Sequence, residues 1–106
     1  MSDDVLQRLA ALIHSRRGED ATKSYTSELL LAGPERCAKK LGEEATETVI
    51  AALGEDPTAL KREAADLVYH LLVLLESRGL ALGDVLAELE SRMGTSGHAE
   101  KAARNA

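Results

Sequence analysis

The chain has 106 residues, with 13 lysines and arginines against 18 aspartates and glutamates, so its net charge is −5. This length fits one domain, and the negative charge argues against a nucleic-acid backbone as a partner. No apolar run comes near the length of a membrane span, no signal-peptide pattern opens the chain, and the lone cysteine, Cys37, excludes an intrachain disulfide. We therefore expect a cytoplasmic protein that binds neither nucleic acid nor membrane.

Apolar residues recur at helical spacing along the chain, and we predict an all-α bundle of five helices. Capping residues, glycines and prolines place these helices at residues 2–15, 25–32, 34–53, 58–78 and 84–93. We expect residues 1–94 to form the domain and residues 95–106 to form a tail, either frayed or ordered on a ligand. The expected inward-facing residues include Leu29, Leu30 and Leu31 in the second helix and Val85, Leu86, Leu89 and Met93 in the fifth.

The core must be built almost without aromatic residues, because Tyr25 and Tyr69 are the only members of the Phe, Trp and Tyr class. Leu, Val, Ile and Ala side chains suit helix-on-helix packing. In so short a chain, a core of this kind often needs a second chain to complete it.

Two pairs of acids interrupt the apolar stripes of the third and fourth predicted helices. At about 100° per residue, Glu44 falls in the same sector as Cys37, where an apolar residue belongs. Glu63 falls inside the leucine stripe of the next helix. Glu47 and Asp66 follow three residues after Glu44 and Glu63, so each pair shares a helix face.

Carboxylates gathered in this way repel one another, and both the repulsion and their burial raise their pKa values. Mg²⁺ and Mn²⁺ prefer oxygen ligands and would relieve both effects. Acidic pairs at this spacing are also common on solvated helix faces. The residues alone therefore leave two interpretations open, a metal site between two helices or exposed acids.

A second candidate site lies at the junction of the loop and the second predicted helix. Lys23, Ser24, Tyr25 and Thr26 combine a cation, three hydroxyls and the free N–H groups of a helix N-terminus. Such a terminus binds phosphate readily, and simple capping of the helix would explain the same residues.

The acid motif, Glu43-Glu44-x-x-Glu47 followed by Glu63-x-x-Asp66, resembles the all-alpha nucleoside triphosphate pyrophosphohydrolase superfamily. Three further stretches are similar to one of its members, the phosphoribosyl-ATP pyrophosphohydrolase family. They are Ser24-Tyr25-Thr26-x-x-Leu29-Leu30, the central segment at residues 65–75 with Tyr69-His70, and Ser96-Gly97-x-x-Glu100-Lys101-Ala102-x-Arg104. The likeness runs from about residue 5 to 104, and it departs at His98-Ala99, where relatives often have an apolar residue and an acid.

The resemblance implies a reaction of the histidine pathway, with Mg²⁺ as cofactor and Mn²⁺ as a substitute. Phosphoribosyl-ATP and water would give the corresponding AMP derivative and pyrophosphate. It also implies a helical homodimer. A cyclohydrolase domain is fused to this domain in some relatives, and we expect it here to be a separate protein that acts next.

The same resemblance assigns roles to residues. The metal ligands it implies are Glu44, Glu47, Glu63 and Asp66. Glu43 is a candidate for the base that orients the water, or for an outer acid, and Lys40 is the first candidate for a triphosphate contact. Lys39 belongs to a basic pair that the family carries, although it points to another side of the helix.

The remaining candidates are substrate contacts. We expect phosphate or ribose contacts from Lys23, Ser24, Tyr25 and Thr26, and contacts to the second phosphoribosyl group from Lys101 and Arg104. His70 follows Asp66 by one helical turn. It either orients that carboxylate or is an ordinary hydrogen-bonded helix histidine.

Two other functions fit parts of the pattern. A pyrophosphohydrolase for another nucleoside triphosphate would use the same acids with a different base pocket. A catalytically silent dimerisation or regulatory module would merely expose them.

Overall fold

The computed structural model describes residues 2–94 and 104, which form five helices and no strand. The helices are α1 (Ser2–Ser15), α2 (Tyr25–Ala32), α3 (Pro34–Leu53), α4 (Pro57–Ser77) and α5 (Leu82–Arg92). The predicted all-α fold is confirmed, and the first three helices have the predicted bounds. Within the described residues, none of these helices combines the length and the apolar character that crossing a membrane requires. Apart from residue 104, the predicted tail lies outside the described residues.

The last two helices each begin slightly earlier than predicted, because of their caps. Asp56 accepts a hydrogen bond from the Thr58 amide (2.9 Å), which makes Pro57 the first residue of α4. Asp84 accepts one from the Ala81 amide (3.3 Å), so this acid lies within the first turn of α5 instead of at its start.

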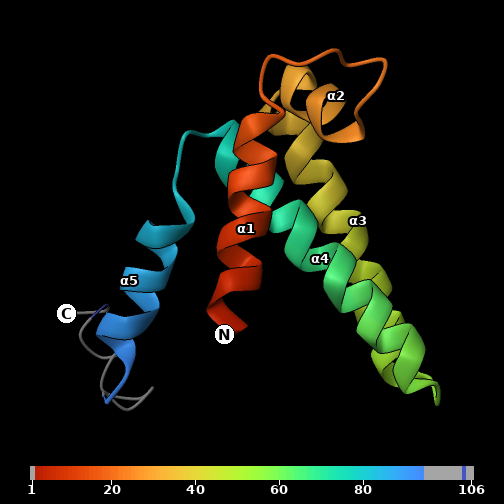
Figure 1. The fold of residues 1–106 in the computed structure, drawn as a ribbon. Helices are drawn as coiled ribbons and strands as arrows, with labels where there is room; N and C mark the ends of the chain where they lie inside the picture. Colours follow the sequence, from red (N-terminus) through yellow and green to blue (C-terminus); the bar gives the residue numbers. More distant parts are fainter. Residues whose placement is uncertain (1, 95–103, 105–106) are drawn as a thin grey trace.

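Helices α3 and α4 form a long hairpin that carries the most extensive helix contact in the described structure. Helix α1 packs on α4, and α2 packs on both members of the hairpin. Figure 1 shows α1 and α2 gathered near one end of the hairpin, and α5 standing apart from it on the far side of α1. The outer half of the hairpin, toward the α3–α4 turn, extends away from the other helices.

The core is small and lies where α1, α2, α3 and α4 meet. Its fully enclosed side chains are aliphatic or sulfur-containing, and partly buried residues such as Tyr69 and Leu75 pack against them. Cys37 is 1% exposed, as expected for a small core residue. The buried hydrophobic residues are Ile13, Leu29, Leu30, Cys37, Leu72 and Val73.

The expected inward positions of Leu31, Leu89 and Met93 are wrong. Leu31 is 81% exposed, because three consecutive residues of a helix spread over about 200° and cannot all face one core. Leu89 and Met93 are 49% and 74% exposed, since the far end of α5 has no helix packed against it among the described residues. Val85 and Leu86, nearer the start of α5, are half-buried.

Candidate functional site

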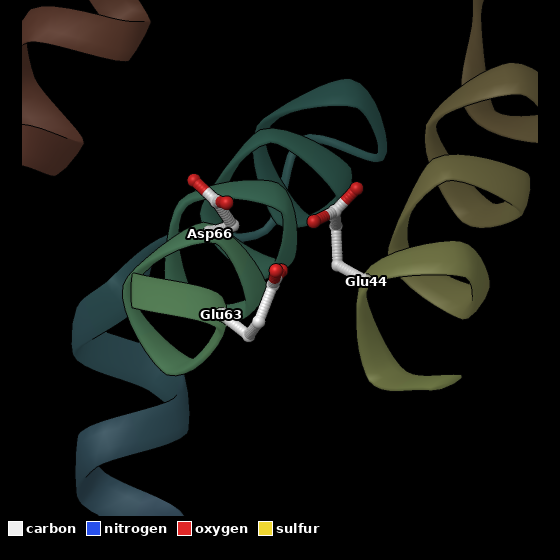
Figure 2. A group of neighbouring side chains, drawn as sticks. All are labelled: Glu44, Glu63 and Asp66. Carbon is white, nitrogen blue, oxygen red and sulfur yellow. The ribbon is translucent and has the colours of Figure 1, made fainter. Parts of the chain in front are cut away.

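Three of the four predicted metal ligands come together between the two helices of the hairpin. One carboxylate oxygen from each of Glu44, Glu63 and Asp66 lies within 4.8 Å of the others. Figure 2 shows Glu44 reaching from α3 toward Glu63 and Asp66, which both project from α4. Helices α3 and α4 pack against each other, and the cluster forms because Glu44 and Glu63 lie on the partly buried stripes of these helices.

The cluster is partly withdrawn from solvent. Glu44 is only 9% exposed and shares its buried stripe with Cys37, while Glu63 is half-buried and Asp66 is exposed. The solvated-face interpretation is therefore wrong for Glu44 and Glu63. A carboxylate in this position costs free energy unless it is paired or bound to a cation.

Thr48 ties the two helices together at the level of the cluster. Its hydroxyl lies 2.7 Å from the carbonyl oxygen of Glu44 and 3.2 Å from that of Glu63, so it can donate to either. Thr48 lies four residues after Glu44, so the helical angle places both residues on the same stripe of α3. A hydroxyl residue on an otherwise buried stripe was the sequence signal that could have identified this cross-helix contact.

The electrostatics of Glu63 show how crowded the cluster is. Burial raises the pKa of its carboxyl group, and the charges of Glu47, Asp66 and Glu44 raise it further. One oxygen of this carboxyl, Oε1, is fully enclosed and has no hydrogen-bond partner in the described structure. An enclosed, unpaired oxygen among like charges fits a hard divalent cation, and an all-oxygen donor set is the type that Mg²⁺ and Mn²⁺ prefer.

Glu47, the fourth predicted ligand, is not part of the 4.8 Å set. Its side chain is exposed on α3, yet it lies close enough for its charge to raise the pKa of Glu63. Its role as a ligand stays a prediction.

Lys40 and Glu43 pair with each other beside the cluster. The Lys40 ammonium donates to Glu43 Oε1 at 3.0 Å, and their side chains are 23% and 46% exposed. This hydrogen bond is the first cause that lowers the pKa of Glu43 and the first that raises the pKa of Lys40. Lys39 is exposed, as its position on the helix predicts.

His70 occupies an enclosed position one turn beyond Asp66 on α4. It is 6% exposed, and its ring meets Tyr69 edge-on at a centroid distance of 4.9 Å and Tyr25 at 6.0 Å. Burial lowers the pKa of His70, which the nearby charge of Glu44 partly opposes. Its Nδ1 has no hydrogen-bond partner within the described residues, so that atom neither orients Asp66 nor satisfies the plain hydrogen-bonded alternative.

The residues at the start of α2 are engaged with the protein itself. The Ser24 hydroxyl accepts from the Ser27 amide (3.1 Å), which is the capping role that the sequence left open. The Thr26 hydroxyl lies 2.5 Å from the Tyr69 hydroxyl, while Lys23 is exposed. Of the other two predicted substrate contacts, Lys101 lies outside the described residues and Arg104 is exposed. Their roles stay predictions.

One further contact was missed by the sequence reasoning. Arg17 Nε donates to Glu76 Oε2 at 2.8 Å, and His14 Nδ1 lies 3.0 Å from the same oxygen. Both basic residues lie at the C-terminal end of α1, where a positive charge also interacts favourably with the helix dipole. The contact joins the end of α1 to the end of α4, away from the carboxylates.

Comparison with known proteins gives this geometry a family. The sequence model of the phosphoribosyl-ATP pyrophosphohydrolase family matches residues 6–93. A Cereibacter sphaeroides protein named phosphoribosyl-ATP pyrophosphatase is 55% identical over 100 residues, covering 94% of this chain and 97% of the relative. Proteins of the same name from Rhodobacter capsulatus and Jannaschia sp. are 54% and 56% identical over 99 residues, covering 93% of this chain and 96% and 97% of their own lengths. The chain belongs to the phosphoribosyl-ATP pyrophosphohydrolase family.

Proposed function

We propose that this protein hydrolyses phosphoribosyl-ATP to phosphoribosyl-AMP and pyrophosphate, the second step of histidine biosynthesis. Family membership supplies the substrate, since the relatives are named for it. The observation that carries the chemistry is the cluster of Glu44, Glu63 and Asp66 between α3 and α4.

The carboxylates of this cluster, with Glu47 beside them, would hold Mg²⁺. The cation would supply a positive charge to the phosphate oxygens and would acidify a water molecule. The enclosed, unpaired Oε1 of Glu63 supports this assignment, because an oxygen in that state needs a positive partner.

Lys40 and Glu43 then divide the remaining work. Lys40 binds a phosphate oxygen of the triphosphate and, in doing so, exchanges its Glu43 partner for the substrate. The released Glu43 carboxylate accepts a proton from the attacking water. The new P–O bond forms as the bond between the α-phosphate and the β-phosphate breaks, and pyrophosphate departs with the electron pair of that bond.

We also propose that two copies of the chain pair through the α3–α4 hairpin. This hairpin exposes large apolar side chains along its length, with Val49, Ile50 and Leu53 at 59%, 64% and 84% and Val68 and Leu71 at 38% and 39%. Large apolar side chains exposed on neighbouring helices mark an interaction surface, and a second hairpin would complete a four-helix arrangement. Light scattering of the purified protein tests this, and a monomer at micromolar concentration would exclude it.

The test of the reaction is a comparison of substrates. Pyrophosphate release is measured with Mg²⁺ on phosphoribosyl-ATP, ATP, dATP and dCTP, with Glu44→Gln as the control for contaminating activity. We expect phosphoribosyl-ATP to have the highest kcat/KM and the variant to be nearly inactive. A preference for dATP or dCTP would replace the substrate assignment, and no hydrolysis of any of them would favour the silent module.

A further inference from the structure

Tyr25 is the more exposed of the two tyrosines. The sequence has only two aromatic residues of the Phe, Trp and Tyr class, and Tyr69 is committed to the core and to Thr26. Tyr25 is 46% exposed, although it begins α2 in the best-packed part of the fold. Its open surface has no structural role that the described contacts explain.

The Tyr25 ring is also held in place. The His70 ring abuts it edge-on, with an interplanar angle of 84°, and His70 is in turn fixed against Tyr69 at 78°. The backbone of Tyr25 follows the Ser24 cap, and the neighbouring Thr26 hydroxyl is bonded to Tyr69. A ring that is already positioned by such contacts loses little freedom when a ligand packs on it.

This ring lies next to the phosphate-binding residues of the proposed site. Tyr25 contacts His70, which lies one turn beyond Asp66, and after the hydrogen bond to Glu43 the nearby Tyr25 hydroxyl is the next cause that raises the pKa of Lys40. His70, on which Tyr25 packs, is close enough to Glu44 and Asp66 for both charges to act on it. A nucleotide whose phosphates reach Lys40 and the carboxylates therefore has Tyr25 within its span.

We propose that the Tyr25 ring, through its solvent-accessible part, stacks on the purine ring of the nucleotide. The inference rests on the proposed function for the identity of the substrate, but the stack itself requires only an adenine nucleotide. It assigns to Tyr25 a contact with the base, through the face of the ring, in place of the phosphate or ribose contact expected from the sequence. Lys40, near the same ring, would bind the triphosphate beside the carboxylate cluster, as proposed above.

Equilibrium binding separates these roles. Titration calorimetry with Mn²⁺ present compares ATP with ribose 5-triphosphate, which lacks only the base, on wild type, Tyr25→Phe and Tyr25→Leu. We expect Tyr25→Leu to weaken ATP binding about 5- to 150-fold, the range for loss of one base–aromatic stack, and to leave ribose 5-triphosphate binding within about twofold. Tyr25→Phe should match wild type for both ligands, as should the matched control Leu31→Ala on the same helix.

Four results would overturn the proposal. Tyr25→Leu could weaken the affinity for both ligands equally, or leave both affinities unchanged. Tyr25→Phe could lose as much ATP affinity as Tyr25→Leu, which would assign the contact to the hydroxyl. Lastly, wild type could bind ATP no more tightly than ribose 5-triphosphate, which would mean that the base contributes no affinity. Circular dichroism confirms that each variant is folded. If wild type fails to hydrolyse phosphoribosyl-ATP but ATP binding depends on the Tyr25 ring, then the proposed function fails while the stacking surface stands.

Discussion

Thr48 is the residue whose replacement best tests how the hairpin holds its carboxylates in register. Its hydroxyl donates toward the carbonyl oxygens of Glu44 on α3 and Glu63 on α4, at 2.7 and 3.2 Å. Valine has nearly the shape of threonine but no hydroxyl. Thr48→Val therefore removes the cross-helix hydrogen bond and leaves the side-chain volume in place.

The expected cost follows from the surroundings of the hydroxyl. Both carbonyl oxygens lie inside helices, where the main chain supplies another donor, so neither is left without a partner. The loss is that of one intramolecular hydrogen bond, about 1 kcal/mol, which corresponds to a Tm about 4–8 °C lower for a domain of this size. A looser register should also weaken Mn²⁺ binding by about 10- to 100-fold, the usual effect of losing a partner that positions a ligand.

Thermal unfolding without metal and titration with Mn²⁺ measure the two effects. Thr46→Val is the matched control, because Thr46 lies on the same helix and its exposed hydroxyl donates only to the Gly42 carbonyl, at 3.1 Å. That variant should stay within about 0.5 kcal/mol of wild type and bind Mn²⁺ normally. If both variants unfold at the same temperature and bind Mn²⁺ equally well, the cross-helix bond has no part in building the site.

Four other substitutions test three separate parts of the structure. Glu44→Gln and Asp66→Asn should each lower the rate of pyrophosphate release by more than about 100-fold, yet raise or maintain the metal-free Tm because carboxylate repulsion is relieved; a large fall in the metal-free Tm would contradict the crowding argument. Burial would raise the pKa of Glu76, but its hydrogen bonds, led by that of Arg17, hold this pKa below its ordinary value of 4.5. The ionised carboxylate therefore stabilises the fold above pH 4.5, and this stabilisation is lost as the pH falls through the folded-state pKa. The urea midpoints of wild type and Glu76→Gln should therefore converge in acid. A constant gap between the two midpoints would refute the linkage. Gly33 has φ 100° and ψ 177°, a region that is essentially glycine's alone, and an added Cβ would meet no atom within 4 Å; Gly33→Ala should therefore cost about 1–3 kcal/mol from strain, seen in urea unfolding, and an unchanged midpoint would exclude it.

The helices could be predicted from the sequence because their signals are local. Gly33-Pro34 marks one boundary, Ser24 caps α2, and apolar residues keep a helical period between the breaks. The burial of Glu44 also followed from periodicity alone, since the angle per residue fixes which side chains share a face. These inferences need no knowledge of how distant segments pack.

Other features depend on tertiary packing and could not be read from periodicity. The exposure of Leu89 reflects where α5 lies relative to α1 and α4, and no local pattern encodes that position. The contact between Arg17 and Glu76 joins residues 59 positions apart, and it forms only once α1 crosses α4. The pairing of Lys40 with Glu43 could have been predicted, because the two residues are one turn apart, but we assigned Lys40 to the triphosphate and Glu43 to the water or to an outer position.

The charge of the site constrains how it binds its ligand. The cluster is made of carboxylates in a chain of net charge −5, and a triphosphate is itself strongly negative, so the two repel each other without a cation. Lys40 brings a single positive charge, and Glu43 already balances it. For the proposed reaction, a divalent cation would therefore have to bind before the nucleotide or together with it, and it would give the enclosed Glu63 oxygen a partner at the same time. The same carboxylate repulsion that is unfavourable within the hairpin would therefore make the proposed nucleotide binding depend on a divalent cation.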